Sequence, residues 1–222
     1  MENDVILEMS KAFVLSYISR AFTYPTEDLI NKLIEAIDDL KACLKVIDVD
    51  FDVVELERIV KSLNVNDLRQ DYENMFLLAL KAPISETAYE LDKTSRRAYE
   101  MADICGFYKA FGTEAQTGIE PDSLPTELEF LSILLQKKIL TDDMENKQIC
   151  DKAYKDFLKD HVGRWYELFC MLVNKNGTTA FYKIITNLTK KILDKETSGL
   201  KIQKLYDYKE ETLIGSIWNC IK

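Results

Sequence analysis

The chain has 222 residues, of which 47% are hydrophobic and 30% charged, a balance typical of globular domains rather than of disordered or membrane-embedded chains. Its seven glycines and four prolines are too few for the many tight turns of an all-β fold. The formal net charge of −9 argues against a nucleic-acid partner, because phosphate binding requires a basic surface. Solubility alone explains that charge, although it also suits a basic peptide.

The cysteines and the N-terminus indicate the compartment. Five cysteines are widely spaced and form no C-x-x-C pair, which indicates a reducing environment. The segment Met1–Asp4 is acidic where a secretory signal would be basic, and no apolar run approaches the length of a membrane span. We therefore expect a cytoplasmic protein without stable membrane insertion.

The first half of the chain shows hydrophobic residues at steps of three and four positions, which predicts helices. Thr26 is a suitable N-terminal cap for the second of them. Pro83 begins an irregular stretch, and Gly112 is a suitable left-handed residue to end the helix before it. The predicted helices of this half cover about 6–21, 26–40, 53–63, 68–76 and 98–111.

Residues 112–122 contain Gly112, Gly118 and Pro121 with few apolar positions, which predicts a hinge loop between an N-terminal helical half, 1–111, and a C-terminal half, 123–222. The tail from 198 is too apolar to be free, so we expect it to dock on the body. The sequence thus predicts an all-α bundle of about ten helices forming one compact unit. Further helices are predicted over about 124–139, 143–159, 161–174 and 178–194.

The sequence offers no recognisable catalytic, metal or nucleotide site. His161 is the single histidine, and no clustered cysteines accompany it. Neither G-x-G-x-x-G nor G-x-x-x-x-G-K-[ST] occurs, and the acidic groups at 38–39 and 142–145 miss the spacing of a magnesium-binding D-D-x-x-[DE] pattern. We predict a protein that is not an enzyme. A helical enzyme or nucleotide hydrolase with an unrecognised site, and a structural adaptor, are the alternatives from other classes.

Three segments carry a more specific pattern. Phe107–Gly112 followed by Pro121–Phe130 reads F-Y-x-x-x-G and then P-D-S-x-x-x-E-L-x-F, while Tyr72–Phe76 reads Y-x-x-M-F before a stretch with Pro83, Ser85 and Tyr89. Phe157–Trp165 reads F-L-x-x-H-x-x-x-W. Together, over residues 72–165, these segments resemble the TorD/DmsD/NarJ family of redox-enzyme maturation chaperones. Met75 stands where the family has leucine, and Ser123 stands where it has histidine.

The resemblance implies a TorD-like helical fold and a chaperone that binds the leader peptide or N-terminus of a molybdopterin oxidoreductase precursor. Such a protein assists cofactor loading and maturation before export or assembly. The alternative within the family is a NarJ-type assembly chaperone of a catalytic subunit that is not exported. We expect no bound cofactor, since no motif supports even a transient contact with molybdopterin or guanine nucleotide. The hinge would permit a domain-swapped homodimer.

A twin-arginine leader requires carboxylates to bind its arginines and a hydrophobic groove to bind its apolar stretch. Alternatively, Asp122 or Ser123 caps the following helix and Glu127, with Glu129, offsets its dipole. Aromatic residues at helical spacing are often core, so we expect at least half of Tyr72, Phe76, Tyr108 and Phe111 to be buried. Polar residues at the break near Pro83 are expected to be exposed. The predicted peptide-binding residues are Tyr72, Phe76, Ser85, Glu86, Tyr89, Tyr108, Glu120, Asp122, Ser123 and Glu127.

Overall fold

The computed structural model describes residues 2–78, 80–89, 94–115, 118–176 and 179–205. Within these ranges the chain forms ten α-helices, two π-helical turns (η1 and η3) and one 3-10 turn (η2), with a single antiparallel bridge between Ser85 and Ser123. The all-α prediction is confirmed. In chain order the elements are α1 (Glu2–Ala21), α2 (Glu27–Glu35), α3 (Ile37–Val46), α4 (Val53–Lys61), α5 (Val65–Tyr72), η1 (Glu73–Leu77), η2 (Glu86–Tyr89), α6 (Thr94–Ala110), α7 (Leu124–Leu140), α8 (Met144–Phe157), η3 (Leu158–Val162), α9 (Gly163–Asn176) and α10 (Ala180–Glu196).

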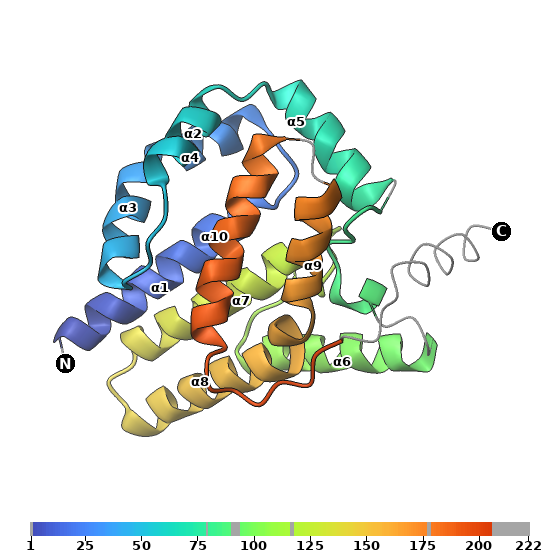
Figure 1. Cartoon of the computed structure of the whole chain (residues 1–222). Helices are drawn as coiled ribbons and strands as arrows, with labels where there is room; N and C mark the ends of the chain where they lie inside the picture. Colours follow the sequence, from blue (N-terminus) through green and yellow to red (C-terminus); the bar gives the residue numbers. More distant parts are fainter. Residues whose placement is uncertain (1, 79, 90–93, 116–117, 177–178, 206–222) are drawn as a thin grey trace.

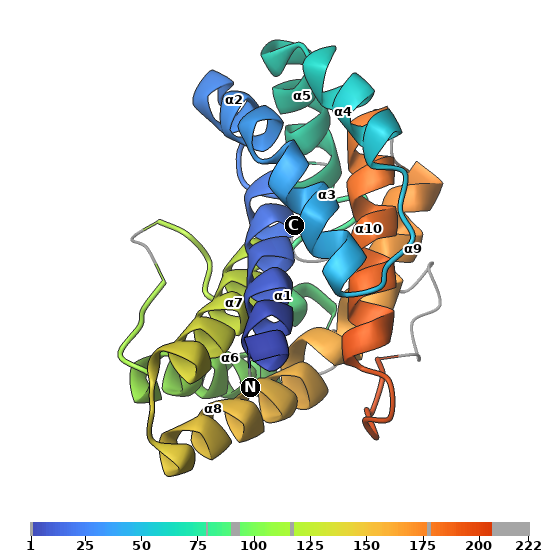
Figure 2. The same cartoon turned by 90° about the vertical axis from the view of Figure 1, so that its left-hand side faces the viewer.

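Helices α1 and α7 lie side by side at the centre of the molecule, and α9 and α10 pack against each other beside them (Figure 1). The short helices α2, α4 and α5 gather at one end, and α6 and α8 lie at the opposite end (Figure 2). Because α1 of the first half packs along α7 of the second half, the described parts of both halves share one core. The hinge role of 112–122 remains a prediction.

Several helix boundaries follow local sequence signals. The Thr26 hydroxyl accepts a hydrogen bond from the Leu29 N–H at 3.1 Å and so caps α2, and Gly112 has a φ of +66° just after α6, both as predicted. The single helix predicted over 26–40 is wrong, because the chain breaks at Ala36 between α2 and α3. The break allows the apolar faces of both short helices to reach α1.

Aromatic side chains fill the core between α1, η1, α9 and α10. The Phe22 ring lies 6.1 Å from Phe76, 5.4 Å from Phe169 and 6.3 Å from Tyr182, measured between centroids. Three of the four aromatic residues expected to be mostly core are buried, and Phe111 is partly buried. That prediction is confirmed: Tyr72, Phe76 and Tyr108 contribute to packing.

The first residues of the predicted tail dock on α9. The Leu205 N–H donates to the Arg164 carbonyl at 3.0 Å, Lys204 forms an ion pair with Glu167, and Leu200 packs on the core. The remainder of the tail, 206–222, lies outside the described residues. Among the helices that are described, none combines the length and the apolar character needed to cross a membrane.

Phe22→Ala should lower the free energy of unfolding by about 3–5 kcal/mol, because its ring is fully buried and its three aromatic contacts would be lost. Chemical denaturation followed by circular dichroism measures the change. Tyr99→Ala is the control: this side chain is 76% exposed, so its removal should change stability by less than about 0.5 kcal/mol. Equal losses in the two variants would contradict this core.

Candidate functional site

Two of the motif segments meet where residues 84–86 pair with residues 122–124 through backbone hydrogen bonds. We call this pairing the strap. The Glu86 N–H donates to the Asp122 carbonyl, and the Leu124 N–H donates to the Ile84 carbonyl, each at 2.8 Å. These bonds flank the Ser85–Ser123 bridge. The strap therefore holds the beginning of η2 against the beginning of α7.

Asp122 fastens the strap from its side chain. Its Oδ2 accepts hydrogen bonds from the Thr87 N–H at 3.0 Å and from the Thr87 hydroxyl at 2.6 Å. Ser123 occupies the N-cap position of α7, but its hydroxyl pairs with the Thr126 hydroxyl at 2.8 Å. Neither side chain caps α7, so the capping alternative is wrong for both.

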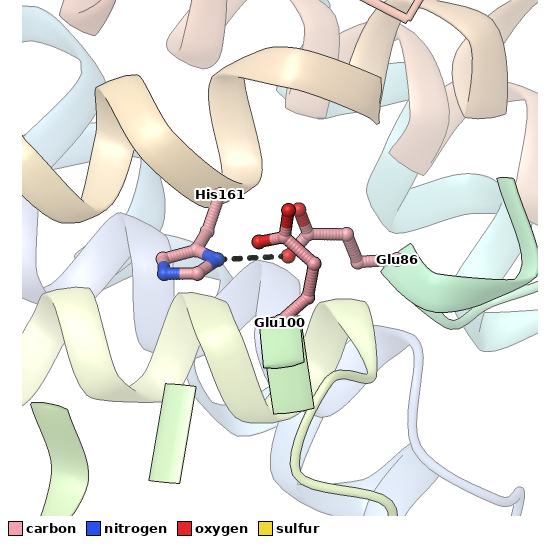
Figure 3. A group of neighbouring side chains, drawn as sticks. All are labelled: Glu86, Glu100 and His161. Atoms are coloured by element: carbon pink, nitrogen blue, oxygen red, sulfur yellow. Dashed lines mark hydrogen bonds and ion pairs between the residues drawn. The ribbon is translucent and has the colours of Figure 1, made fainter. Parts of the chain in front are cut away.

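Glu86 is fully buried and lies between two basic side chains, His161 and Arg164, of which Figure 3 shows His161. Its Oε2 is 3.1 Å from His161 Nδ1, and its Oε1 is 3.3 Å from Arg164 Nη1. Arg164 Nη1 also lies 3.1 Å from Glu100 Oε1 on α6. The cluster thus ties η2, α6, η3 and α9 together.

The same cluster has the composition of a metal site. One ligand atom each from Glu86, Glu100 and His161 lies within 4.8 Å of the other two. However, the Arg164 guanidinium contacts both carboxylates and already supplies the positive charge. A divalent cation there would face that guanidinium at close range, so we interpret the cluster as a buried ion-pair network.

His161 is completely buried against the Phe157 and Phe107 rings. Burial alone would lower its pKa, but the hydrogen bond and charge of Glu86, with the charges of Asp103 and Glu100, outweigh burial and raise the pKa above 6.5. Its Nε2 lies 3.3 Å from Asp103 Oδ2, near enough for an ion pair but not aligned for a hydrogen bond. The surrounding carboxylates therefore favour the protonated form of His161.

Glu127 is a second fully buried carboxyl, one turn into α7. The Trp165 indole N–H donates to its Oε2 at 3.2 Å. Burial first, and then the charges of Glu86 and Asp122, raise the pKa of Glu127 well above 4.5. The raised pKa favours the neutral carboxyl, and the helix-dipole alternative for Glu127 remains a prediction.

Tyr89 is equally buried, with its hydroxyl donating to the Pro83 carbonyl at 2.7 Å and its ring 5.3 Å from the Trp165 ring. The expectation that the polar residues after Pro83 are exposed is therefore wrong for Glu86 and Tyr89. Glu86 pairs with His161 of η3, and the Tyr89 ring packs on Trp165 of α9, both more than 70 positions later in the chain. These residues build the wall of the site rather than its surface.

A groove of about 790 Å³ lies beside this wall. Its lining combines apolar side chains with a few polar ones, and it includes Leu77, Leu80 and Met101, which sequence reasoning missed. The leucines directly follow the Tyr72–Phe76 motif, and that proximity was the available signal. Of the predicted peptide-binding residues, six line the groove: Tyr72, Phe76, Ser85, Glu120, Asp122 and Ser123.

A smaller hollow of about 370 Å³, the side pocket, adjoins the groove. Thr23, Ile119 and Pro125 line both hollows, so the two lie next to each other. Tyr108, another predicted residue, lines the side pocket and donates from its hydroxyl to the Pro121 carbonyl at 2.7 Å. Glu86, Tyr89 and Glu127 line neither hollow and lie buried behind them.

Glu127→Gln should become increasingly more stable than the unmodified protein as pH rises from about 5 to about 9. Because the folded-state pKa of Glu127 is raised, its stabilising contribution is present at low pH and is lost as pH rises through that pKa. Glutamine keeps an acceptor for Trp165 and does not titrate. His161, whose pKa is also raised, is present in both proteins, so its contribution to the pH dependence of stability cancels in the comparison.

Thermal unfolding of the two proteins across this pH range measures the difference. A gap that stays constant, or that closes as pH rises, would show that Glu127 is not held in its neutral form.

Three comparisons with known proteins bear on the family. The model of the nitrate reductase delta subunit family matches residues 29–171. The chain is 30% identical over 147 residues to a perchlorate reductase assembly chaperone protein of Dechloromonas aromatica (strain RCB), a match covering 62% of this chain and 65% of that relative, just under two thirds of its length.

The crystal structure of a proposed redox enzyme maturation protein from Archaeoglobus fulgidus superimposes with a TM-score of 0.52 at 19% identity, over 81% of this chain and 91% of that one. At that identity the likeness shows the fold alone. The family match contains the whole of 72–165, where the three motif segments lie. The chain therefore belongs to the nitrate reductase delta subunit family, the redox-enzyme maturation chaperones of the TorD/DmsD/NarJ type.

Proposed function

We propose that this chain is an assembly chaperone that binds the leader peptide, or the N-terminal segment, of a molybdopterin oxidoreductase in its groove. The observation that carries the proposal is the groove itself, to whose lining the Tyr72–Phe76 and Pro121–Phe130 motif segments both contribute. Its volume of about 790 Å³ lies within the range of ligand-binding clefts. Holding the segment there would delay export or assembly until the cofactor is in place.

The apolar part of the groove suits the apolar stretch of such a peptide. Tyr24, Leu77 and Ile119 line it and are 45%, 49% and 42% exposed, respectively. Large apolar side chains with this exposure are the surface that a ligand can remove from water, at about 25 cal/mol per Å². Tyr72 and Phe76 also line the groove, but their side chains are buried and contribute mainly to packing.

The accessible carboxylates determine where basic residues can bind. Asp122 is only 1% exposed and is engaged by Thr87, so a peptide arginine cannot use it as a free partner. Glu120 in the groove and Glu129 and Glu114 in the side pocket remain accessible. We therefore place the arginine pair of the peptide where the groove and the side pocket adjoin. The net charge of −9 also favours binding of a basic peptide.

The client is inferred from the relatives. The relative from Dechloromonas aromatica is named as an assembly chaperone of perchlorate reductase, and the family is named for nitrate reductase. We propose the catalytic subunit of an enzyme of this class as the partner. The nitrate reductase name favours one second candidate, a NarJ-type chaperone whose client is not exported, for which the arginine pair would be dispensable.

Titration calorimetry with a twin-arginine leader peptide from a molybdopterin oxidoreductase of the same organism tests the proposal. We expect micromolar or tighter binding, a free energy of about −8 kcal/mol or better. Changing both peptide arginines to alanine should weaken binding about tenfold or more, since two charge-assisted contacts are lost. Glu120→Gln and Glu129→Gln should each weaken it about two- to fivefold, the scale of one partly exposed ion pair.

Glu35→Gln is the matched control, because Glu35 is exposed on α2 and lines neither hollow. No binding of either peptide would refute the leader hypothesis for that client. Equal binding of both peptides would instead favour the NarJ-type candidate, with recognition through the apolar groove alone.

A further inference from the structure

Leu80 adopts a backbone conformation that a leucine rarely has. Its φ is +46°, and the other described non-glycine residue with positive φ is Asp48. Aspartate tolerates the left-handed region because its short polar side chain can bond locally, whereas a bulky apolar side chain there is strained. The Asp48 carbonyl is also held by Lys195 Nζ at 3.0 Å. Leu80 has no such chemical reason for its conformation.

The chain that follows Leu80 is anchored at Lys81, Ala82 and Pro83, which holds the strain in place. The Ala82 N–H donates to the Met75 carbonyl at 3.1 Å, closing the turn back onto η1. The Asn176 amide donates to the Lys81 carbonyl at 3.4 Å, and Tyr89 holds the Pro83 carbonyl. Strain that surrounding structure maintains in this way is characteristic of binding and switch sites.

This conformation accompanies a small apolar edge on the groove. We name Leu77, Leu78 and Leu80 the leucine turn. Leu77 and Leu80 line the groove, whereas Leu78, which is 72% exposed, does not. Leu77 itself is 49% exposed. Two leucines of one turn therefore present apolar surface to the groove, and a third one beside them provides an internal comparison.

We propose that the leucine turn selects the apolar stretch of the client peptide, and that Leu80 keeps its strained backbone because that conformation places its side chain in the groove. The inference rests on the proposed function and adds to it the residues that contact the apolar part of the peptide. An apolar peptide segment is the occupant that fits, since Leu77, Leu80 and Met101 are apolar side chains of the groove lining. The acidic Glu120 lies on the segment of 118–123 instead.

The test measures affinity and stability on the same variants of the full chain. Leu80→Gly and Leu80→Asn both accept a positive φ, and both should unfold at equal or higher denaturant concentration than the unmodified protein while binding the leader peptide about tenfold more weakly. Leu77→Ala should weaken binding similarly. Leu78→Ala is the matched control and should leave binding unchanged.

A second peptide separates apolar from charged recognition. When the apolar stretch of the leader is replaced by serines and its arginines are kept, the loss caused by Leu80→Gly should disappear, as expected for two directly coupled groups. Unchanged binding in both Leu80 variants, reduced stability in Leu80→Gly, or an equal loss in Leu78→Ala would overturn the inference. A dimer that the Leu77 and Leu80 changes dissociate, with peptide affinity unaltered, would assign the turn to a contact between copies.

Failure of this inference is distinguishable from failure of the proposed function. If the unmodified protein binds no leader peptide, the proposed function fails and the leucine turn loses its ligand with it. If the unmodified protein binds and the Leu80 variants bind equally well, the function stands and only the role of the leucine turn is refuted.

Discussion

Glu86 places a carboxylate where water cannot reach it, and a buried charge without a partner is among the most costly groups that a fold can contain. His161 and Arg164 compensate it from η3 and α9. The two Glu86 contacts span 75 and 78 positions, and the Arg164–Glu100 ion pair adds α6, so the cluster forms only when η2, η3, α9 and α6 are all in place. The strap to Asp122 then fixes η2 against α7, and residues of both paired segments line the groove.

The motif residues therefore divide into two layers with different tasks. Glu86, Tyr89, Glu127, His161 and Trp165 are fully buried and bond to one another or to the backbone around them. The surface that a ligand could touch comes from neighbouring positions, among them Glu120, Ile119 and Leu77. A family pattern rich in polar residues can in this way mark the supports of a binding site as much as the site itself.

Sequence periodicity was sufficient for the fold because most helices carry a clear apolar stripe and local capping signals such as Thr26. It was insufficient at Ala36, where the stripe continues through the break and only packing on α1 separates the two helices. For the site, the sequence indicated the right segments but not the depth of their residues. The burial of Glu86 depends on partners far along the chain, and the positive φ of Leu80 contradicts the preference of its own residue type, so neither has a local signal.

Ser123 has a consequence for how the groove responds to its surroundings. The family pattern has histidine at this position, and histidine is the side chain whose charge ordinarily changes between pH 5 and 8. Serine does not titrate, and the chain's single histidine, His161, is sealed in the ion-pair cluster away from the groove lining. The described lining of the groove thus contains no imidazole that could sense protons, and its acidic and basic side chains include Glu120 and Arg97.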